Sequence, residues 1–173
     1  SGVGFLNDGE IYNNGDIYNN GKFDDYAYGM IHNNPAGSIT ISNLGVMTLS
    51  GKTTNSGIIT NSGNIIIEEG NIGSDCKICN TITGSLNNNS GGTINFTGSS
   101  GKGINNSGNI KNNSGGTIIL SNPGNGINNF GTITNSSIIN NFGEIKNKCG
   151  ATYLGIPPNV NSIIEQCDSC VLP

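Results

Sequence analysis

The sequence predicts an all-β fold: a single-stranded β-solenoid, or β-helix, followed by a non-repetitive C-terminal tail. The first observation is a six-residue period, in which an aliphatic or aromatic residue recurs at Ile11, Ile17 and Phe23. The second is that Asn follows two positions after the aliphatic residue, as at Asn13 and Asn19, with Gly between the repeats. A helix would need apolar residues at three- and four-residue steps, and an isolated hairpin would need longer alternation. The period is typical of a stacked β-coil.

A short strand followed by a corner explains this period. The strand supplies an inward aliphatic residue, and Asn and Gly then turn the corner, where both tolerate positive φ. Tandem units wind into a solenoid whose coils pair about 4.8 Å apart. Asn at equivalent corners can stack into amide ladders, since each carboxamide both donates and accepts. A disordered Asn/Gly/Ser tract is the alternative, but it gives no reason for a six-residue spacing.

The first half of the chain is mostly regular. Residues 5–23 are clean hexads, whereas residues 24–35 predict a looser coil or an excursion from one corner, because they include the turn-forming Asn34-Pro35 pair. Regular repeats resume at Ile39 and continue to Ile67.

The second half contains three expected interruptions. Residues 70–80 break the period, and longer inserts are expected at residues 98–103 and 121–126. Elsewhere between residues 86 and 149 the hexads dominate, with aliphatic residues at Ile104, Ile110, Ile127, Ile133, Ile139 and Ile145.

These repeats divide the chain into a solenoid and a tail. If one coil takes three strands and about 18 to 24 residues, residues 1–150 form roughly six to eight coils. Residues 151–173 contain Pro157-Pro158 and no hexad, so we expect a C-terminal cap or a tail that links subunits.

Composition excludes several classes of protein. Of the 173 residues, 33% are hydrophobic and 10% charged, which suits one narrow aliphatic core. A net charge of −4 with no arginine leaves no basic face for nucleic acid. No apolar run is long enough to span a membrane. Because Ser1 is not an initiator Met, we expect a processed chain.

The Gly-x-Ile-x-Asn hexads of residues 5–150 resemble those of secreted β-helix surface proteins of bacteria and archaea, including the filamentous-haemagglutinin and autotransporter type. The resemblance implies a β-helix, and a role as an adhesin or a structural part of the cell surface. Left-handed β-helices also repeat every six residues, but they usually place Gly or a small residue straight after the aliphatic one. A right-handed solenoid is favoured here because that position carries larger residues, namely Tyr12, Tyr18, Lys111, Thr134 and Lys146.

The five cysteines are the sharpest chemical signal. Two Cys-x-x-Cys pairs, Cys76/Cys79 and Cys167/Cys170, have the spacing of a thiolate zinc site. Disulfides are favoured instead, because Cys149 is a fifth cysteine and the composition suits an oxidising extracellular setting. A bond from Cys149 to the tail would fix the tail over the last coil. The odd count leaves one thiol free or intermolecular.

Five glycosylation sequons fit the same compartment. A chain rich in Asn, Ser and Thr produces sequons by chance, so their occupancy is a hypothesis. The candidate acceptors are Asn88, Asn95, Asn105, Asn112 and Asn135.

Catalytic constellations are weak, so we expect no enzyme and no cofactor. The only paired acids, Asp24-Asp25 and Glu68-Glu69, are expected to be solvated corners. The only histidine, His32, has no neighbouring acid in the sequence to orient it as a base.

The sequence therefore favours a structural subunit of an extracellular filament or cell-surface assembly, with copies of itself as partners. Solenoid ends expose unpaired strand edges, and head-to-tail contacts between identical subunits generate open filaments. A monomeric glycan-binding adhesin is the alternative, because Tyr12, Tyr18, Tyr26 and Tyr28 form an N-terminal cluster in the sequence. A polysaccharide-processing β-helix enzyme is a third possibility.

Overall fold

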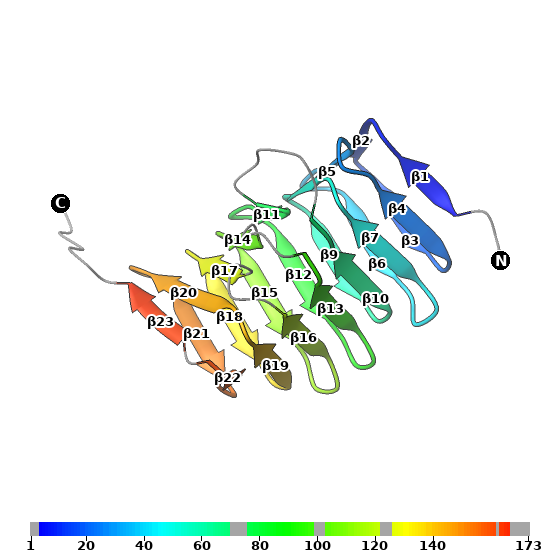
Figure 1. Ribbon diagram of the computed structural model, residues 1–173. Coiled ribbons are helices and arrows are strands. Elements are labelled where there is room, and N and C mark those ends of the chain that lie inside the picture. Colours follow the sequence, from blue (N-terminus) through cyan, green and yellow to red (C-terminus); the bar gives the residue numbers. More distant parts are fainter. Residues whose placement is uncertain (1–3, 70–75, 99–102, 122–125, 162, 167–173) are drawn as a thin grey trace, which may run out of the picture.

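The computed structural model is a parallel β-solenoid with three sheets (Figure 1). It describes residues 4–69, 76–98, 103–121, 126–161 and 163–166. The chain visits the three sheets in turn, and each strand pairs in parallel with the strand three places further along. All regular elements of these residues are strands, which confirms the predicted fold class.

The sheets, named A, B and C in the order in which the chain reaches them, run along the whole solenoid. Sheet A contains β1 (Phe5–Asn7), β4 (Lys22–Asp25), β7 (Val46–Leu49), β10 (Asn64–Ile67), β13 (Thr93–Phe96), β16 (Thr117–Leu120), β19 (Ile138–Asn141) and β22 (Asn159–Val160). Sheet B contains β2 (Glu10–Asn13), β5 (Met30–Asn33), β8 (Lys52–Asn55), β11 (Ile78–Asn80), β14 (Ile104–Asn106), β17 (Gly126–Asn129), β20 (Glu144–Lys148) and β23 (Ile163–Gln166). Sheet C contains β3 (Asp16–Asn19), β6 (Ser38–Ile41), β9 (Ile58–Asn61), β12 (Ser85–Asn88), β15 (Asn109–Asn112), β18 (Thr132–Asn135) and β21 (Thr152–Gly155).

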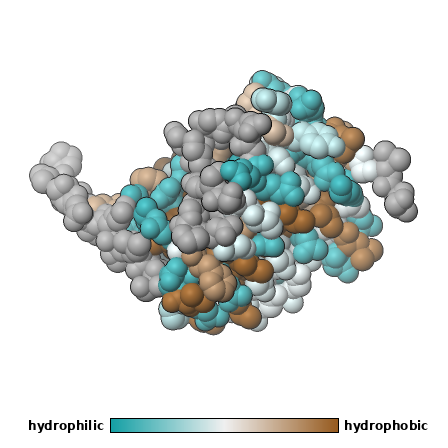
Figure 2. All heavy atoms as spheres, viewed as in Figure 1, coloured by the Kyte–Doolittle hydropathy of each residue, from teal (hydrophilic) through white to brown (hydrophobic). Residues whose placement is uncertain are grey.

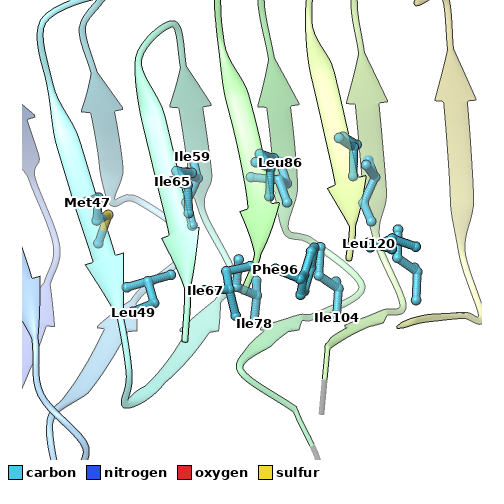
Figure 3. Packing of buried hydrophobic residues seen from close by; sticks show 14 of the residues in the cluster. Met47, Leu49, Ile59, Ile65, Ile67, Ile78, Leu86, Phe96, Ile104 and Leu120 are labelled. Carbon is cyan, nitrogen blue, oxygen red and sulfur yellow. The ribbon is translucent and has the colours of Figure 1, made fainter. Parts of the chain in front are cut away.

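Most of the core is built from the second residue of the four-residue strands. That residue is buried and the residues on either side of it are not, as the strand alternation requires. Equivalent residues of successive turns lie in register, for example Ile65 beside Ile94 in sheet A. Figure 3 shows such side chains filling the interior between the sheets. The hexad register is confirmed, because at most 1% of the surface is exposed at each of Ile110, Ile133, Ile139 and Ile145.

The fourth residue of each strand lies at a corner, and at two of the three corners it is usually Asn. At the corner between sheets B and C, seven buried asparagines form one unbroken ladder. Each donates its Nδ2 to the Oδ1 of the next over 2.7 to 2.8 Å, through Asn13, Asn33, Asn55, Asn80, Asn106, Asn129 and Asn147. At the corner between sheets C and A, a shorter ladder of 2.8 to 2.9 Å bonds joins Asn61, Asn88, Asn112 and Asn135.

The corner between sheets A and B, which we call the AB corner, is different. Its middle positions are apolar, at Leu49, Ile67, Phe96 and Leu120. The three interruptions expected from the sequence all leave from this corner, after β10, β13 and β16. Part of each lies outside the described residues, and the expected break at residues 70–80 includes β11.

Glycine at the corners is explained mainly by the close approach of successive turns. A Cβ added to Gly57 would lie 2.1 Å from the carbonyl oxygen of Gly37, which is far inside contact distance. We expected positive φ at these corners. Among the described residues, however, positive φ occurs only at Gly91, Gly115, Gly150, Gly155 and Val160.

Three other expectations can be compared with the structure. Residues 24–35 contain no excursion: β5 is regular, and its corner closes with a bond of 2.7 Å from the Gly37 N–H to the Asn34 carbonyl. Stacked asparagines lie 18 to 27 residues apart, which is a wider range than the expected coil length of about 18 to 24 residues. Each sheet has seven or eight strands, which agrees with roughly six to eight coils. Strands continue beyond residue 150, at which we expected the solenoid to end, as far as Gln166. The right-handed winding of the solenoid stays a prediction.

Replacing a core isoleucine by an acid should abolish folding. Ile133 is fully buried in β18, so Ile133→Asp would bury an unpaired charge. The cost should consume most of a typical stability of about 5–15 kcal/mol. Circular dichroism should show no cooperative transition, whereas the neighbouring outward variant Thr134→Asp should unfold like the parent. Similar midpoints for the two variants would contradict the inward register.

Removing one rung of the long ladder should also be costly. Asn106 accepts from Asn80 and donates to Asn129 Oδ1 and to the carbonyl oxygens of Gly108 and Thr132. We expect Asn106→Ala to lower the free energy of unfolding by about 3 kcal/mol or more, because it leaves buried polar partners unsatisfied. The control is Asn109→Ala on β15, whose side chain is exposed and should cost less than about 1 kcal/mol. Urea unfolding of both variants measures the difference.

Candidate functional site: the open end of the solenoid

The N-terminal end of the solenoid exposes apolar residues that are continuous with its core. β1, β2 and β3 are the edge strands of sheets A, B and C at this one end, and no described strand pairs with their outer edges. Ile11 and Ile17 pack against the core on one side only. They line a hollow of about 310 Å³ together with Phe5, Tyr18, Asn19 and Phe23.

Aromatic residues give this end its shape. Phe5 stacks on Phe23 with ring centroids 4.9 Å apart, yet 55% of its surface is exposed. Figure 2 shows hydrophobic residues among hydrophilic ones on the side drawn, including the end that carries β1. Such an apolar end is costly to leave in water.

The opposite end also exposes apolar side chains. Leu154 and Ile156 are each 51% exposed and Val160 is 66% exposed. β21, β22 and β23 are the edge strands of their sheets here. The structure does not describe the side chains of the last strand, β23, or residues 167–173. We expected this segment to act in assembly.

The four tyrosines predicted as one cluster do not share a face. Tyr12 points outward from sheet B and Tyr18 from sheet C, while Tyr26 and Tyr28 lie in the AB corner after β4. Tyr12 stacks on His32 in the next turn, with ring centroids 4.6 Å apart and planes 8° apart. Its hydroxyl donates to Glu10, and this hydrogen bond raises the pKa of Tyr12. His32 therefore has a stacking partner.

Three of the four paired acids meet at the AB corner, whereas both pairs were expected to be solvated corners. Asp24, Asp25 and Glu68 line one cleft of about 250 Å³, also lined by Lys22, Tyr26, Thr48 and Ser50. Glu68 is exposed as expected, but Asp24 and Asp25 are 8% and 1% exposed, which corrects that expectation. The strand β4 carries both aspartates into a packed turn instead of leaving them in a loop.

The charges of this cleft are partly paired. Lys22 Nζ lies 2.6 Å from Asp24 Oδ2, and the Ser50 hydroxyl donates to Glu68 over 3.1 Å. The buried Lys77 donates to the Ser50 carbonyl oxygen over 2.6 Å. Burial raises the pKa of Asp25 to about 6, although a hydrogen bond from Asn7 and the charge of Lys77 both lower it. Within the described residues, no group of three acidic, His or Cys side chains is placed to hold a metal ion.

One cysteine pair is joined. Cys76 and Cys79 form a disulfide at the start of β11, with Cα atoms 5.5 Å apart, so these two sulfurs are not available as zinc ligands. Cys149 is also disulfide-bonded. Cys167 and Cys170 lie outside the described residues, and the link from Cys149 to the tail stays a prediction.

The predicted glycosylation acceptors fall into two groups. Asn88, Asn112 and Asn135 are rungs of the ladder between sheets C and A and are at most 1% exposed. Asn95 and Asn105 are the third residue of β13 and the second of β14, and their side chains are half-buried on the outer surface. Of the five predicted acceptors, only Asn95 and Asn105 keep part of their side chains exposed in the folded chain.

No protein-family model matches the chain, and no curated protein matches it. The resemblance to secreted β-helix surface proteins therefore rests on the repeat pattern alone. Among the described residues, no helix is long and apolar enough to cross a membrane.

Glycan occupancy should follow the burial of the acceptors. When the chain is secreted from a glycosylating host, we expect folded material to carry glycans at Asn95 or Asn105 and none at the three ladder positions, because a modified ladder Asn cannot donate to its neighbours. Peptide mapping by mass spectrometry measures this. Asn95→Gln combined with Asn105→Gln should remove all added mass, and a glycan on Asn88, Asn112 or Asn135 in folded protein would contradict the assigned burial.

Proposed function

We propose that this protein is a structural subunit of an extracellular filament or cell-surface assembly, in which β-solenoids stack head to tail. The observation that carries the proposal is the open apolar end formed by Phe5, Ile11, Ile17 and Phe23. The outer edges of β1, β2 and β3, which pair with no described strand, surround it, and such edges pair with another chain when nothing covers them.

The occupant that we assign to this end is the last turn of a second copy. Inside the chain, each turn covers the one before it by parallel strand pairing and stacked apolar residues. The opposite end offers edge strands of the same three sheets and the exposed side chains of Leu154, Ile156 and Val160. A junction between copies would therefore repeat the contact already present between turns. A contact between two different ends of identical subunits extends without limit unless rotation closes it.

An extracellular location is supported by the disulfide-bonded cysteines. A disulfide between Cys76 and Cys79, together with a bonded Cys149, suits an oxidising compartment better than the cytosol. The low content of charged residues, 10%, leaves main-chain pairing and apolar packing as the main source of affinity between copies.

A monomeric glycan-binding module is the second candidate. The exposed ring of Tyr12, backed by His32 and next to Glu10, offers a flat surface and a polar group of the kind that sugars contact. It is less favoured because the other tyrosines lie on different faces.

Charge at the open end should block assembly. We expect the parent chain to form rods in negative-stain micrographs and species in sedimentation whose size grows with concentration. Phe5→Glu places a carboxylate at the rim of the apolar hollow and should give a folded monomer. The affinity between copies in solution should fall at least tenfold.

The matched control is Leu44→Glu. Leu44 is 71% exposed in the connection between β6 and β7, on the side of the solenoid, so this variant should assemble like the parent. Undiminished assembly of Phe5→Glu would show that the open end is not the contact. A parent that stays strictly monomeric at high concentration would favour the glycan-binding module.

A further inference from the structure

Asp25 occupies the place of a ladder asparagine at the AB corner. It is the fourth residue of β4 and lies in register below Asn7, whose Nδ2 donates to Asp25 Oδ1 over 2.7 Å. Asn7 therefore makes the same hydrogen bond to Asp25 that a ladder asparagine makes to the next one. The residue after it in the column is Leu49, which has no polar side chain.

An asparagine in this geometry uses its Nδ2 group as a donor toward the following turn. Asn33, for example, donates to Asn55 Oδ1 over 2.7 Å and to the Ile58 carbonyl oxygen over 3.2 Å. A Cβ built on Gly57 in that following turn would lie 2.1 and 2.5 Å from the carbonyl oxygens of Gly37 and Asn34, and 3.0 Å from Asn33 Nδ2. The amide donor and two carbonyl oxygens thus gather around one point.

The same point at Gly51 is surrounded by three oxygens. A Cβ on Gly51 would lie 2.1 Å from Gly29 O, 2.7 Å from Tyr26 O and 2.5 Å from Asp25 Oδ2. Asp25 Oδ2 therefore stands where Asn33 carries its Nδ2 donor. It is buried and has no hydrogen-bond partner among the described residues. A carboxylate supplies only acceptors, whereas a carboxylic acid supplies the missing donor.

The charged groups around Asp25 do not remove this conflict. Lys77, which precedes β11, is the cation that favours the ionised form, but its Nζ donates to Ser50 O. On β4 itself, Lys22 and Asp24 pair with each other, and Glu68 after β10 accepts from Ser50 Oγ. β1 contributes the neutral Asn7. His32 on β5 points outward and stacks on Tyr12.

We propose that Asp25 is a proton-controlled rung. When it is protonated, it takes the role of a ladder asparagine and holds the first turns to the third. When it is ionised, it weakens this contact. The device lies within one chain and acts whether or not copies assemble. Because burial raises the pKa of Asp25 from 3.8 to about 6, its contribution to stability is fully present below pH 3.8 and is lost as the pH rises through about 6. Proton binding changes the unfolding equilibrium by up to tenfold per pH unit in that window, about 100-fold in all.

The test compares Asp25→Asn with the parent between pH 4 and pH 7, at a dilution where both are monomeric. Urea unfolding should show the parent losing up to about 100-fold in its folding equilibrium constant relative to Asp25→Asn over this range. The protection factors of the β1 amides, which correct for the intrinsic rise of exchange with pH, should fall with pH in the parent and stay constant in the variant. Comparing the two chains cancels the contributions that do not involve Asp25.

Asp16→Asn is the matched control, because Asp16 is an exposed acid at the start of β3. This variant should show the same pH dependence of unfolding as the parent. Carbon NMR of the parent gives a measurement that needs no variant: one carboxyl carbon should titrate near pH 6. A parallel pH dependence in the parent and Asp25→Asn, or titration of every aspartate below about pH 4.5, would overturn the proposal. If Asp25→Asn does not fold, the carboxyl titration of the parent and of Asp16→Asn decides alone.

Discussion

The turn-to-turn stacking of buried asparagine side chains is the interaction on which this solenoid depends. At two of the three corners the inward fourth residue of the strand is usually Asn, and a buried amide there must find partners for its own donor and acceptor. The carboxamide solves this because it accepts from the turn before and donates to the turn after, at the spacing of paired strands. Seven such rungs in one column, from Asn13 to Asn147, tie sheets B and C together along the molecule. Each rung also binds main-chain carbonyl groups that the corner would otherwise leave unpaired.

The AB corner shows what happens where the ladder is absent. Its inward positions are Leu49, Ile67, Phe96 and Leu120, which pack against one another and impose no hydrogen-bond geometry on the residues that follow. All of the long connections leave from this corner. An amide rung demands a tight corner in every turn, whereas an apolar rung does not, so insertions are tolerated here. The disulfide between Cys76 and Cys79 lies at the end of the longest of these connections, where no ladder bond fixes the chain.

The ends of the molecule follow from the same repetition. A stack of identical contacts has no intrinsic end, and the first and last described turns present the surfaces that every inner turn buries. Phe5 and Ile11 at one end, and Val160 at the other, are in register with residues of the neighbouring turn that are buried, namely Phe23, Ile31 and Asn141. This is the physical basis of the proposed assembly. Asp25 lies one turn below the open end, so a proton there would act on the turn that forms the proposed contact.

The hexad spacing by itself determined the fold class, the inward isoleucines and the presence of amide ladders, because a period of six with Asn two residues after Ile fits only a stacked coil. Only the tertiary structure decided which side chains meet across turns. Stacked asparagines are separated by 18 to 27 positions, and the sequence does not say at which corner the extra residues leave. Asp24, Asp25 and Glu68 therefore could not be brought together from the sequence. The glycines were predicted for their backbone freedom, but most are required because the turns approach so closely, and that packing distance exists only once the coil is formed.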